Sequence, residues 1–413
     1  MIVLVANLGS TSFKYKLFDM SVGERVLATG AADRIGTPGA PGAPGVPASA
    51  GMSHDRGRGF PDHAAAIEYH LHQLVADGVI DSISRIDAIG FKAVHGGPIG
   101  STSGGGAVIV DEQVLATMQK FADVAPAHNP PYIAAMRAFA KLPGPGAGVP
   151  QVAAFETAFH QTIPASRSTY AIPHQWTEDL GIRRYGFHGA SHRYIATRMA
   201  ELTPDARRII SCHLGGSSSI CAIRDGRSVA TSMGLTPQTG LPQSARVGDF
   251  DIFALLKLNA AGITTDAALK TLGKEAGLLG ISGVSGDLRD IEAAAAQGNA
   301  RARLAIDVFV EAIRHYIGAY LAVLNGADAI VFTGGIGQNA KAIRAAVLND
   351  MDYAGISLDK NKNAICEGSE ESRIDAASGK TRIWVLPTNE ELIVARQTVD
   401  VLTTANRKPQ TAN

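Results

Sequence analysis

Two short segments combine glycine with hydroxyl side chains directly after an apolar run. They are residues 7–12 (NLGSTS) and residues 213–219 (HLGGSSS). Glycine lets the backbone come close to a bound group, and serine and threonine hydroxyls add donors to the backbone N–H groups, which suits an anion. We therefore expect both turns to bind the phosphates of a nucleotide, with Ser10 and Ser12 as donors in the first of them.

A third segment with nucleotide-binding character is residues 335–340 (GIGQNA), which follows an apolar run and is expected to open a helix. It fits the loose pattern G-x-G-x-x-A, so a dinucleotide-dependent oxidoreductase is one hypothesis. The segment stands late in the chain, however, and a helix N-terminus that receives part of a nucleotide explains it equally well. The sequence contains no Walker A motif.

Several histidines stand beside glycine or proline at the ends of apolar runs, among them His95, His128 and His188. Three such residues in polar loops of one chain favour a site for an anion. His188 and His192 are four residues apart, a spacing that suits metal binding on a helix, but the intervening Gly189 and the lack of a nearby carboxylate argue against zinc. The three cysteines form no CxxC pair, so neither a disulfide framework nor a structural zinc site is expected.

Buried strands must position these groups. Apolar runs that end in a polar or glycine cluster are typical of strands covered on both faces. They occupy residues 2–6, 88–94, 149–155, 209–212, 329–332 and 383–386, with helices expected at residues 62–77, 111–124, 300–325, 341–349 and 391–403. This order predicts an α/β fold with its site at the strand ends.

The spacing of the two glycine–hydroxyl turns indicates a duplication. Their offset is 213 − 7 = 206 residues, half of the 413-residue chain, and each turn is followed by a further strand-like segment. We expect two copies of one fold with an active-site cleft between them.

The composition excludes several classes of protein. The 38 basic residues balance 38 acidic ones, which gives no overall field for nucleic acid or an anionic membrane. No apolar run approaches the length of a membrane span, and the N-terminal run lacks the basic region of a signal peptide. A cytoplasmic protein is therefore expected.

Ten segments, in this order along the chain, resemble the acetate kinase family, which also includes propionate kinases. They are NLGSTSFKYKLF, VHGG, APAHNPP, FETAFHQTIP, YGFHGASH, HLGGSSS, TSMGLTP, ARVGDFD, FTGGIGQN and TNEEL. The resemblance implies two duplicated actin-like (ribonuclease H-like) domains, here residues 1–154 plus 391–413 on the acceptor side and residues 155–390 on the nucleotide side. It also implies a homodimer and a reversible, direct in-line transfer of the γ-phosphoryl group of ATP to acetate, with Mg²⁺ or alternatively Mn²⁺.

The resemblance also implies roles for individual residues. The catalytic positions match Glu156, His188, Arg246 and His128, and the magnesium-associated positions match Asn7 and Glu390. The acceptor positions match Lys92, Val94, Ala127, Phe187 and Pro237. The nucleotide and phosphate positions match Lys14, His213, Leu214, Gly215, Gly216, Ser217, Asp287, Leu288, Arg289, Gly335, Ile336, Gly337, Gln338 and Asn339.

The chain departs from the family pattern at a few of these positions. Lys92 and Glu156 stand where the family has Arg and Asp, Ala127 stands where it usually has Leu, and Gln338 replaces a Glu. The stretch 241–244 before Arg246 also differs. A longer short-chain acid as acceptor and pyrophosphate as donor therefore stay as alternatives. A non-catalytic nucleotide sensor is a third, although retention of His188, Arg246 and Glu390 argues against it.

Overall fold

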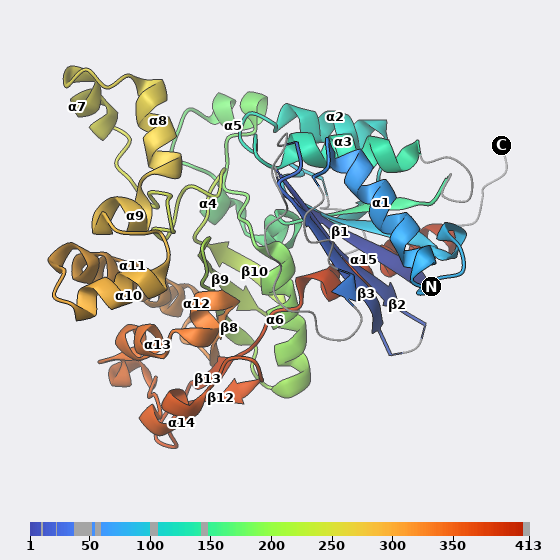
Figure 1. Cartoon of the computed structure of the whole chain (residues 1–413). Helices are drawn as coiled ribbons and strands as arrows, with labels where there is room; N and C mark the ends of the chain where they lie inside the picture. Colours follow the sequence, from blue (N-terminus) through green and yellow to red (C-terminus); the bar gives the residue numbers. More distant parts are fainter. Residues whose placement is uncertain are drawn as a thin grey trace. The chain divides into compact units, whose positions relative to one another are not determined.

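The computed structural model describes residues 1–9, 11–21, 23–36, 52–53, 59–99, 106–141 and 148–407. The chain divides into two compact units, Met1–Gln161 with Asn389–Asn413, and Thr162–Thr388 (Figure 1). The expected boundaries at 154/155 and 390/391 put Glu156 and Glu390 in the second half, whereas both belong to the first unit. The N–H of Glu156 donates to the carbonyl of Ala93 at 2.9 Å, which continues a strand ladder of the first unit.

The first unit is built on a seven-stranded mixed sheet in the order β4-β3-β2-β1-β5-β7-β6. The central strand of this sheet is apolar from Ile2 to Ala6, and Val3 to Ala6 are at most 1 % exposed because both faces of the strand are covered. The strands are β1 (Ile2–Leu8), β2 (Ser12–Asp19), β3 (Arg25–Asp33), β4 (Met52–Ser53), β5 (Ala88–Ala93), β6 (Ala107–Ile109) and β7 (Gln151–Phe155).

Helices cover both faces of this sheet. One face packs on α1, α2 and α3, whereas on the other Val394 of α15 joins Val3 and Val5 of β1 in one buried cluster. A Cβ atom at Gly90 of β5 would collide with Thr398 of α15, so the close approach of helix to sheet requires glycine there. The helices are α1 (His63–Ala76), α2 (Glu112–Lys120), α3 (Asn129–Ala140) and α15 (Glu390–Arg407).

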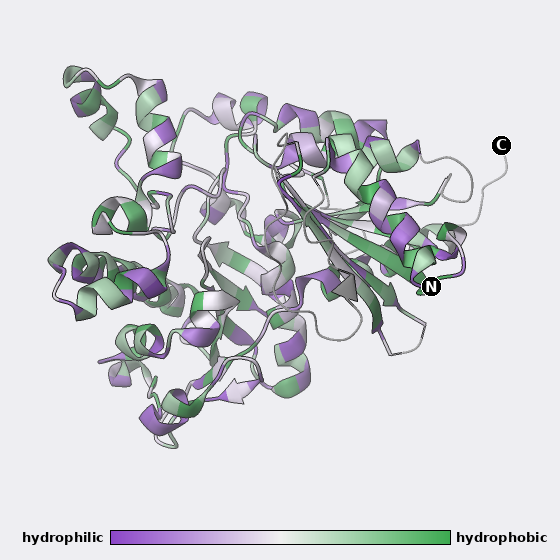
Figure 2. Cartoon of the chain, in the orientation of Figure 1, coloured by the Kyte–Doolittle hydropathy of each residue, from purple (hydrophilic) through white to green (hydrophobic). Residues whose placement is uncertain are grey.

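The second unit contains a six-stranded sheet in the order β10-β9-β8-β11-β13-β12. In Figure 2 several strands of this sheet are coloured green, that is hydrophobic, whereas the short β12 is not. They are β8 (Arg208–His213), β9 (Ser219–Arg224), β10 (Arg227–Thr231), β11 (Ala329–Thr333), β12 (Ser372–Arg373) and β13 (Arg382–Val385).

The longest helix, α11 (Ala300–Leu324), lies on this sheet with Phe309, Ile313 and Ile317 fully buried. Its N-cap Asn299 accepts from the N–H of Ala302 at 3.0 Å. The other helices are α4 (Ala165–Ser168), α5 (His174–Leu180), α6 (Gly189–Leu202), α7 (Ala254–Ala260), α8 (Thr265–Lys274), α9 (Gly277–Ser282), α10 (Leu288–Ala296), α12 (Gly334–Asn339), α13 (Lys341–Leu348) and α14 (Lys360–Ile365).

The two sheets share one topology, which confirms the predicted duplication. In β3-β2-β1-β5-β7 and in β10-β9-β8-β11-β13, three antiparallel strands are followed by two parallel ones. The turns at 7–12 and 213–219 are equivalent, since they join β1 to β2 and β8 to β9.

One helix prediction needs correction. The expected helix over 111–124 ends at Lys120, and the next residues form turns. The segment 335–340 begins a helix as expected, since α12 spans Gly334–Asn339, and the helix expected at 341–349 is α13.

Candidate active site

A buried ion cluster lies at the ends of the central strands of the first unit. Lys92 of β5 places its Nζ 3.4 Å from Oε1 of Glu156, just after β7, and contacts the carboxylate of Glu390, the first residue of α15. Burial by itself lowers the pKa of Lys92, but the charges of Glu390 and Glu156 outweigh it and raise the pKa above its ordinary value. One ammonium between two carboxylates leaves the cluster with one net negative charge.

A tyrosine that the sequence analysis did not single out connects this region to the first turn. The hydroxyl of Tyr132 in α3 accepts from the N–H of Leu8 at 3.0 Å and donates to Oδ1 of Asn7 at 3.4 Å. Asn7 is paired in register with Lys14 of β2, so both side chains stand on one face of the sheet. Burial raises the pKa of Tyr132, which keeps the hydroxyl protonated as a donor.

The first glycine–hydroxyl turn is tight. The N–H of Gly9 donates to the carbonyl of Ser12 at 2.9 Å, and a Cβ atom at Gly9 would lie 2.5 Å from the Ser12 hydroxyl oxygen. Ser12 is half-buried at the start of β2, and Ser10 lies outside the described residues.

The loops that carry the remaining first-unit residues are held together by Asn129. Its side-chain oxygen accepts from the N–H of His95 at 3.2 Å, and its amide donates to the carbonyls of His95 at 3.0 Å and Met118 at 2.8 Å. This brings the loop after β5 next to the start of α3. The three predicted residues on these loops are Val94, Ala127 and His128, of which Ala127 is exposed.

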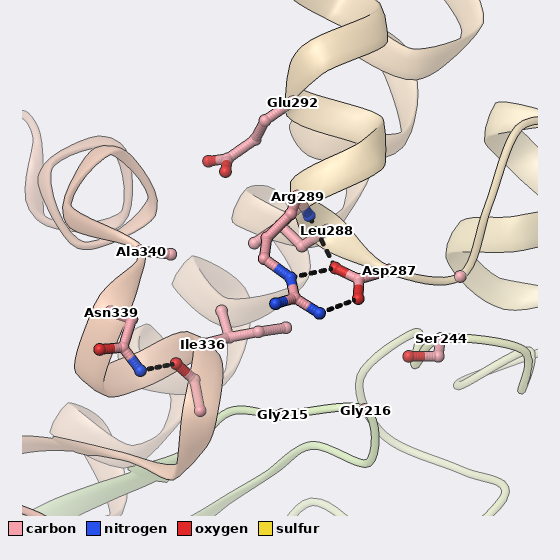
Figure 3. A pocket seen from close by; sticks show the side chains of 12 residues that line it. Gly215, Gly216, Ser244, Asp287, Leu288, Arg289, Glu292, Ile336, Asn339 and Ala340 are labelled. Carbon is pink, nitrogen blue, oxygen red and sulfur yellow. Dashed lines mark hydrogen bonds and ion pairs between the residues drawn. The ribbon is translucent and has the colours of Figure 1, made fainter. Parts of the chain in front are cut away.

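The second unit contains a cavity of about 690 Å³. It is bounded by the turn after β8, the start of α10, and α12 (Figure 3). Eight of the residues predicted to bind nucleotide line it: Gly215, Gly216, Asp287, Leu288, Arg289, Gly335, Ile336 and Asn339.

The polar groups of this cavity differ in how they are satisfied. Arg289 holds both oxygens of Asp287, at 3.0 and 2.6 Å, and this bonding lowers the pKa of the Asp287 carboxyl to about 2. Asn339 donates to the carbonyl of Gly335 at 2.9 Å. Glu292 of α10 also faces the cavity, and burial raises its pKa because none of the described residues forms an ion pair or hydrogen bond with its carboxylate (Figure 3).

Further predicted nucleotide residues lie beneath the cavity. Leu214 is fully buried, and its carbonyl accepts from the N–H groups of Ile336 and Gly337 at 2.9 and 3.1 Å. At the other end of α12, the buried Arg344 donates to the carbonyls of Gly337 and Gln338 at 2.9 and 2.6 Å. These residues fix α12 against the end of β8.

The predicted catalytic arginine is held by neutral oxygens. Nη1 of Arg246 donates to Ser217 Oγ at 3.3 Å and to Gln243 Oε1 at 3.1 Å. Gln243, which the sequence analysis did not assign, also accepts from Ser217 at 2.8 Å and donates to the carbonyl of Pro237 at 2.6 Å. Arg246 forms no ion pair with any residue that the structure describes, and burial lowers its pKa.

Three histidines gather at the end of β8. His188 precedes α6 in the left-handed backbone conformation (φ 56°), which is uncommon for a non-glycine residue. Its ring stacks on that of His213 with 4.2 Å between centroids, and the ring of His192 lies 6.5 Å from that of His188. Phe187, the remaining predicted acceptor residue of this unit, directly precedes His188 in the sequence, and its side chain is buried.

Neither a metal cage nor a membrane helix is found within the described ranges. No group of three or more His, Cys, Asp or Glu side chains there is arranged to hold a metal ion. Among the same residues no helix is both long and apolar enough to cross a membrane.

The duplicated actin-like topology and a cavity of nucleotide size indicate a nucleotide-binding protein with two actin-like domains. Comparison with known proteins identifies its family. Residues 2–396 match the model of the Acetokinase family. An acetate kinase of Desulfitobacterium hafniense is 43% identical over 415 residues, which covers 97% of this chain and 99% of that protein.

Solved structures agree with this match. The acetate kinase of Porphyromonas gingivalis superposes with a TM-score of 0.87 at 38% identity, covering 97% of this chain and 99% of that one. A propionate kinase of Francisella tularensis gives a TM-score of 0.86 at 33% identity, with the same coverage of 97% and 99%. The chain belongs to the Acetokinase family.

Proposed function

We propose that this protein is an acetate kinase that transfers the γ-phosphoryl group of ATP reversibly to acetate, giving acetyl phosphate and ADP. The family match over residues 2–396 supports this assignment. The observation that carries it in the site itself is the half-buried guanidinium of Arg246, which has no carboxylate partner among the described residues and can therefore bind a substrate anion.

The mechanism follows from charge. A carboxylate acceptor has a pKa near ~4 to 5, so it is already deprotonated at pH 7 and needs no general base. The difficulty is to bring one anion onto another, and catalysis must come from positioning and from groups that stabilise negative charge. We assign Arg246 and His188 to the transferring phosphoryl group, and His128 to the same reaction centre.

The donor site is assigned to the cavity of the second unit. Leu288, Ile336 and Ala340 give it apolar walls that suit a base, and Gly215 and Gly216 allow phosphates to approach the backbone. Pyrophosphate has no base that could pack against these apolar walls, so the cavity supports ATP as the phosphoryl donor. Lys14, Ser12 and His213 are proposed as further phosphate contacts.

The first unit is assigned to the acceptor and to a magnesium ion. Asn7 and Glu390 offer oxygen donors, the type that Mg²⁺ prefers, and Mg²⁺ is usually bound by one or two protein oxygens together with substrate phosphates. Such an ion, when bound, would neutralise phosphate charge. Glu156 orients Lys92 by the ion pair at 3.4 Å. Lys92 is proposed to contact the carboxylate, and a bound Mg²⁺ would offset the net negative charge of the cluster.

The decisive experiment traps the product. The enzyme is incubated with hydroxylamine, Mg²⁺ and acids from acetate to valerate, once with ATP and once with pyrophosphate. We expect acyl hydroxamate with acetate and ATP. Acyl hydroxamate formed with pyrophosphate but not with ATP would make pyrophosphate the donor. No product under any condition would favour a nucleotide sensor.

A homodimer and a cytoplasmic location belong to the same proposal and rest on the family alone. Sedimentation of the purified protein at several concentrations tests the first, and cell fractionation tests the second.

A further inference from the structure

Three buried side chains of the second unit form a continuous hydrogen-bonded chain that ends on the half-buried His188. Ser211 Oγ of β8 lies 2.9 Å from Nδ1 of His192, and Nε2 of His192 lies 2.9 Å from Oγ of Ser219 in β9. The same Ser219 oxygen lies 2.8 Å from Nδ1 of His188. His192, Ser211 and Ser219 are all fully buried, which removes water as a competing partner.

Proton counting limits this chain to two directions. The hydroxyl of Ser219 carries one hydrogen, and among the described residues its hydrogen-bond partners are the two imidazoles, so it donates to one of them and accepts from the other. If it donates to His192, then Nδ1 of His188 must carry a hydrogen. If it donates to His188, then Nε2 of His192 carries the hydrogen, the hydroxyl of Ser211 donates to Nδ1 of His192, and the hydrogen of a neutral His188 is on Nε2.

The second direction suits a site for an anion. A neutral His188 with its hydrogen on Nε2 keeps a donor on the nitrogen that Ser219 does not use, whereas the first direction leaves a lone pair there. His213, whose Nδ1 lies 2.7 Å from Ser191 Oγ, stacks on His188 at 4.2 Å. Two protonated rings at that distance would repel each other, so the stack disfavours a state in which both rings are charged.

We propose that the chain Ser211–His192–Ser219 holds His188 as the Nε2–H tautomer, so that a neutral imidazole donates a hydrogen bond to the transferring phosphoryl group. His192, Ser219 and Ser211 are then positioning residues. This inference rests on the proposed kinase function for its phosphoryl group, but the tautomer itself is independent of that function. It assigns His188 a hydrogen bond rather than a full positive charge.

The first test reads the tautomer directly. The full-length protein is labelled with ¹⁵N-histidine, and the His188 signals are identified by their loss in His188→Gln. We expect a protonated Nε2 and an unprotonated Nδ1 in the wild type, and a tautomer mixture in Ser219→Ala. A wild-type His188 protonated on Nδ1 would overturn the proposal, whatever the reaction of the enzyme.

The second test measures kinetics. Removing an outer partner that orients a histidine typically costs about 10- to 100-fold in activity. Ser219→Ala is expected to lower kcat by that factor with little change in the KM for ATP, while Ser219→Thr keeps the hydroxyl and retains activity. Ser211→Ala repeats the test at the far end of the chain.

Ser228 of β10 supplies the matched control, because it is equally buried and its hydroxyl lies 3.3 Å from Cys221 Sγ. Ser228→Ala is expected to leave the His188 signals and kcat unchanged. An equal loss in Ser228→Ala and Ser219→Ala would show a general packing effect and contradict a positioning role. A catalytically inactive wild type with the expected tautomer would reject the proposed function and leave the hydrogen-bond chain standing.

Discussion

At the scale of single residues, Arg246 differs from several other arginines of the second unit. Arg207, Arg208 and Arg382 sit in ion pairs with aspartates, whereas the described side chains that bond to Arg246 are the neutral Ser217 and Gln243. Partial burial of a cation without a counter-ion lowers stability. We expect a substrate anion to supply the missing negative charge.

Replacing Arg246 by Ala should therefore act on the reaction more than on binding. We expect kcat to fall by about 10² to 10³, the usual scale for removing a transition-state donor, while KM for ATP and acetate move less. Steady-state kinetics in the direction of acetyl phosphate formation measure both. A wild-type kcat in Arg246→Ala would exclude this residue from the reaction centre.

Glu292 permits a prediction about stability and pH. Because burial raises its pKa in the folded state above that of the unfolded chain, its contribution to the free energy of unfolding is fully present below about pH 4 and is lost as the pH rises through the folded-state value. Glu292→Gln removes this loss. The variant should melt at a higher temperature than the wild type at pH 7, with the gap closing near pH 4.

The same substitution should weaken nucleotide binding, since the carboxylate faces the cavity. We expect a higher KM for ATP in the more stable variant, which is the usual trade-off between stability and activity at active sites. Melting curves at both pH values and ATP titrations provide the readouts. A lower melting temperature at pH 7 would reveal a stabilising partner for Glu292.

At the scale of elements, the loop before α3 permits a test of acceptor choice. Ala127 is exposed in this loop, and Asn129 fixes the loop to the residues after β5. With the small side chain, propionate should have a kcat/KM at least comparable to that of acetate.

Ala127→Leu should then restore preference for acetate, by the ~1–3 kcal/mol that one methylene contributes in an apolar pocket. The KM for ATP serves as the internal control and should stay constant. A strong acetate preference in the wild type, unchanged in Ala127→Leu, would place the end of the acyl pocket elsewhere.

Strands were easier to predict than contacts between them. Runs such as 2–6 and 329–332 are apolar at every position because both of their faces are buried, and that signal is local. The partners of Asn7 and Arg246 are not local in this sense: Tyr132 stands 125 residues from Asn7, and Ser217 stands 29 residues from Arg246. No spacing rule connects such residues, so Tyr132, Gln243 and Glu292 emerged only from the fold.

One helix end was placed wrongly. The sequence predicted a helix over 111–124, whereas α2 ends at Lys120 and turns follow. The start of α13 at Lys341 was predicted, but the contacts of its buried Arg344 with the carbonyls of Gly337 and Gln338 in α12 emerged only from the fold.

At the scale of the whole molecule, the first unit is assembled from two distant stretches of chain. Helix α15 packs on one face of the first sheet, and its side chains Ile393, Val394 and Leu402 are buried. At about 1.5–3 kcal/mol for each such side chain, these three contribute roughly 5–9 kcal/mol. That is comparable to the total stability of a typical domain, about 5–15 kcal/mol.

Ending the chain after Thr388 should therefore unfold the first unit and leave the second intact. Limited proteolysis is expected to degrade residues before 162 and to spare a fragment that covers the sheet from β8 to β13. Val394→Asp and Val394→Ile in the full chain serve as the disruptive and conservative controls. A protease-resistant first unit in the shortened chain would show that α15 is dispensable.

The discontinuity of the first unit also sets an order of events during protein synthesis. Its sheet emerges from the ribosome with one face uncovered, and residues 162–389, which number 389 − 161 = 228, must follow before α15 begins at Glu390. At about 5–20 residues per second this interval lasts on the order of 10 to 50 s. The second unit, which is continuous in sequence, can complete its core within that time, so the part made first is the part that folds last. The nascent chain exposes β1 and β5 throughout this interval, and molecular chaperones that bind apolar strands have their main opportunity there.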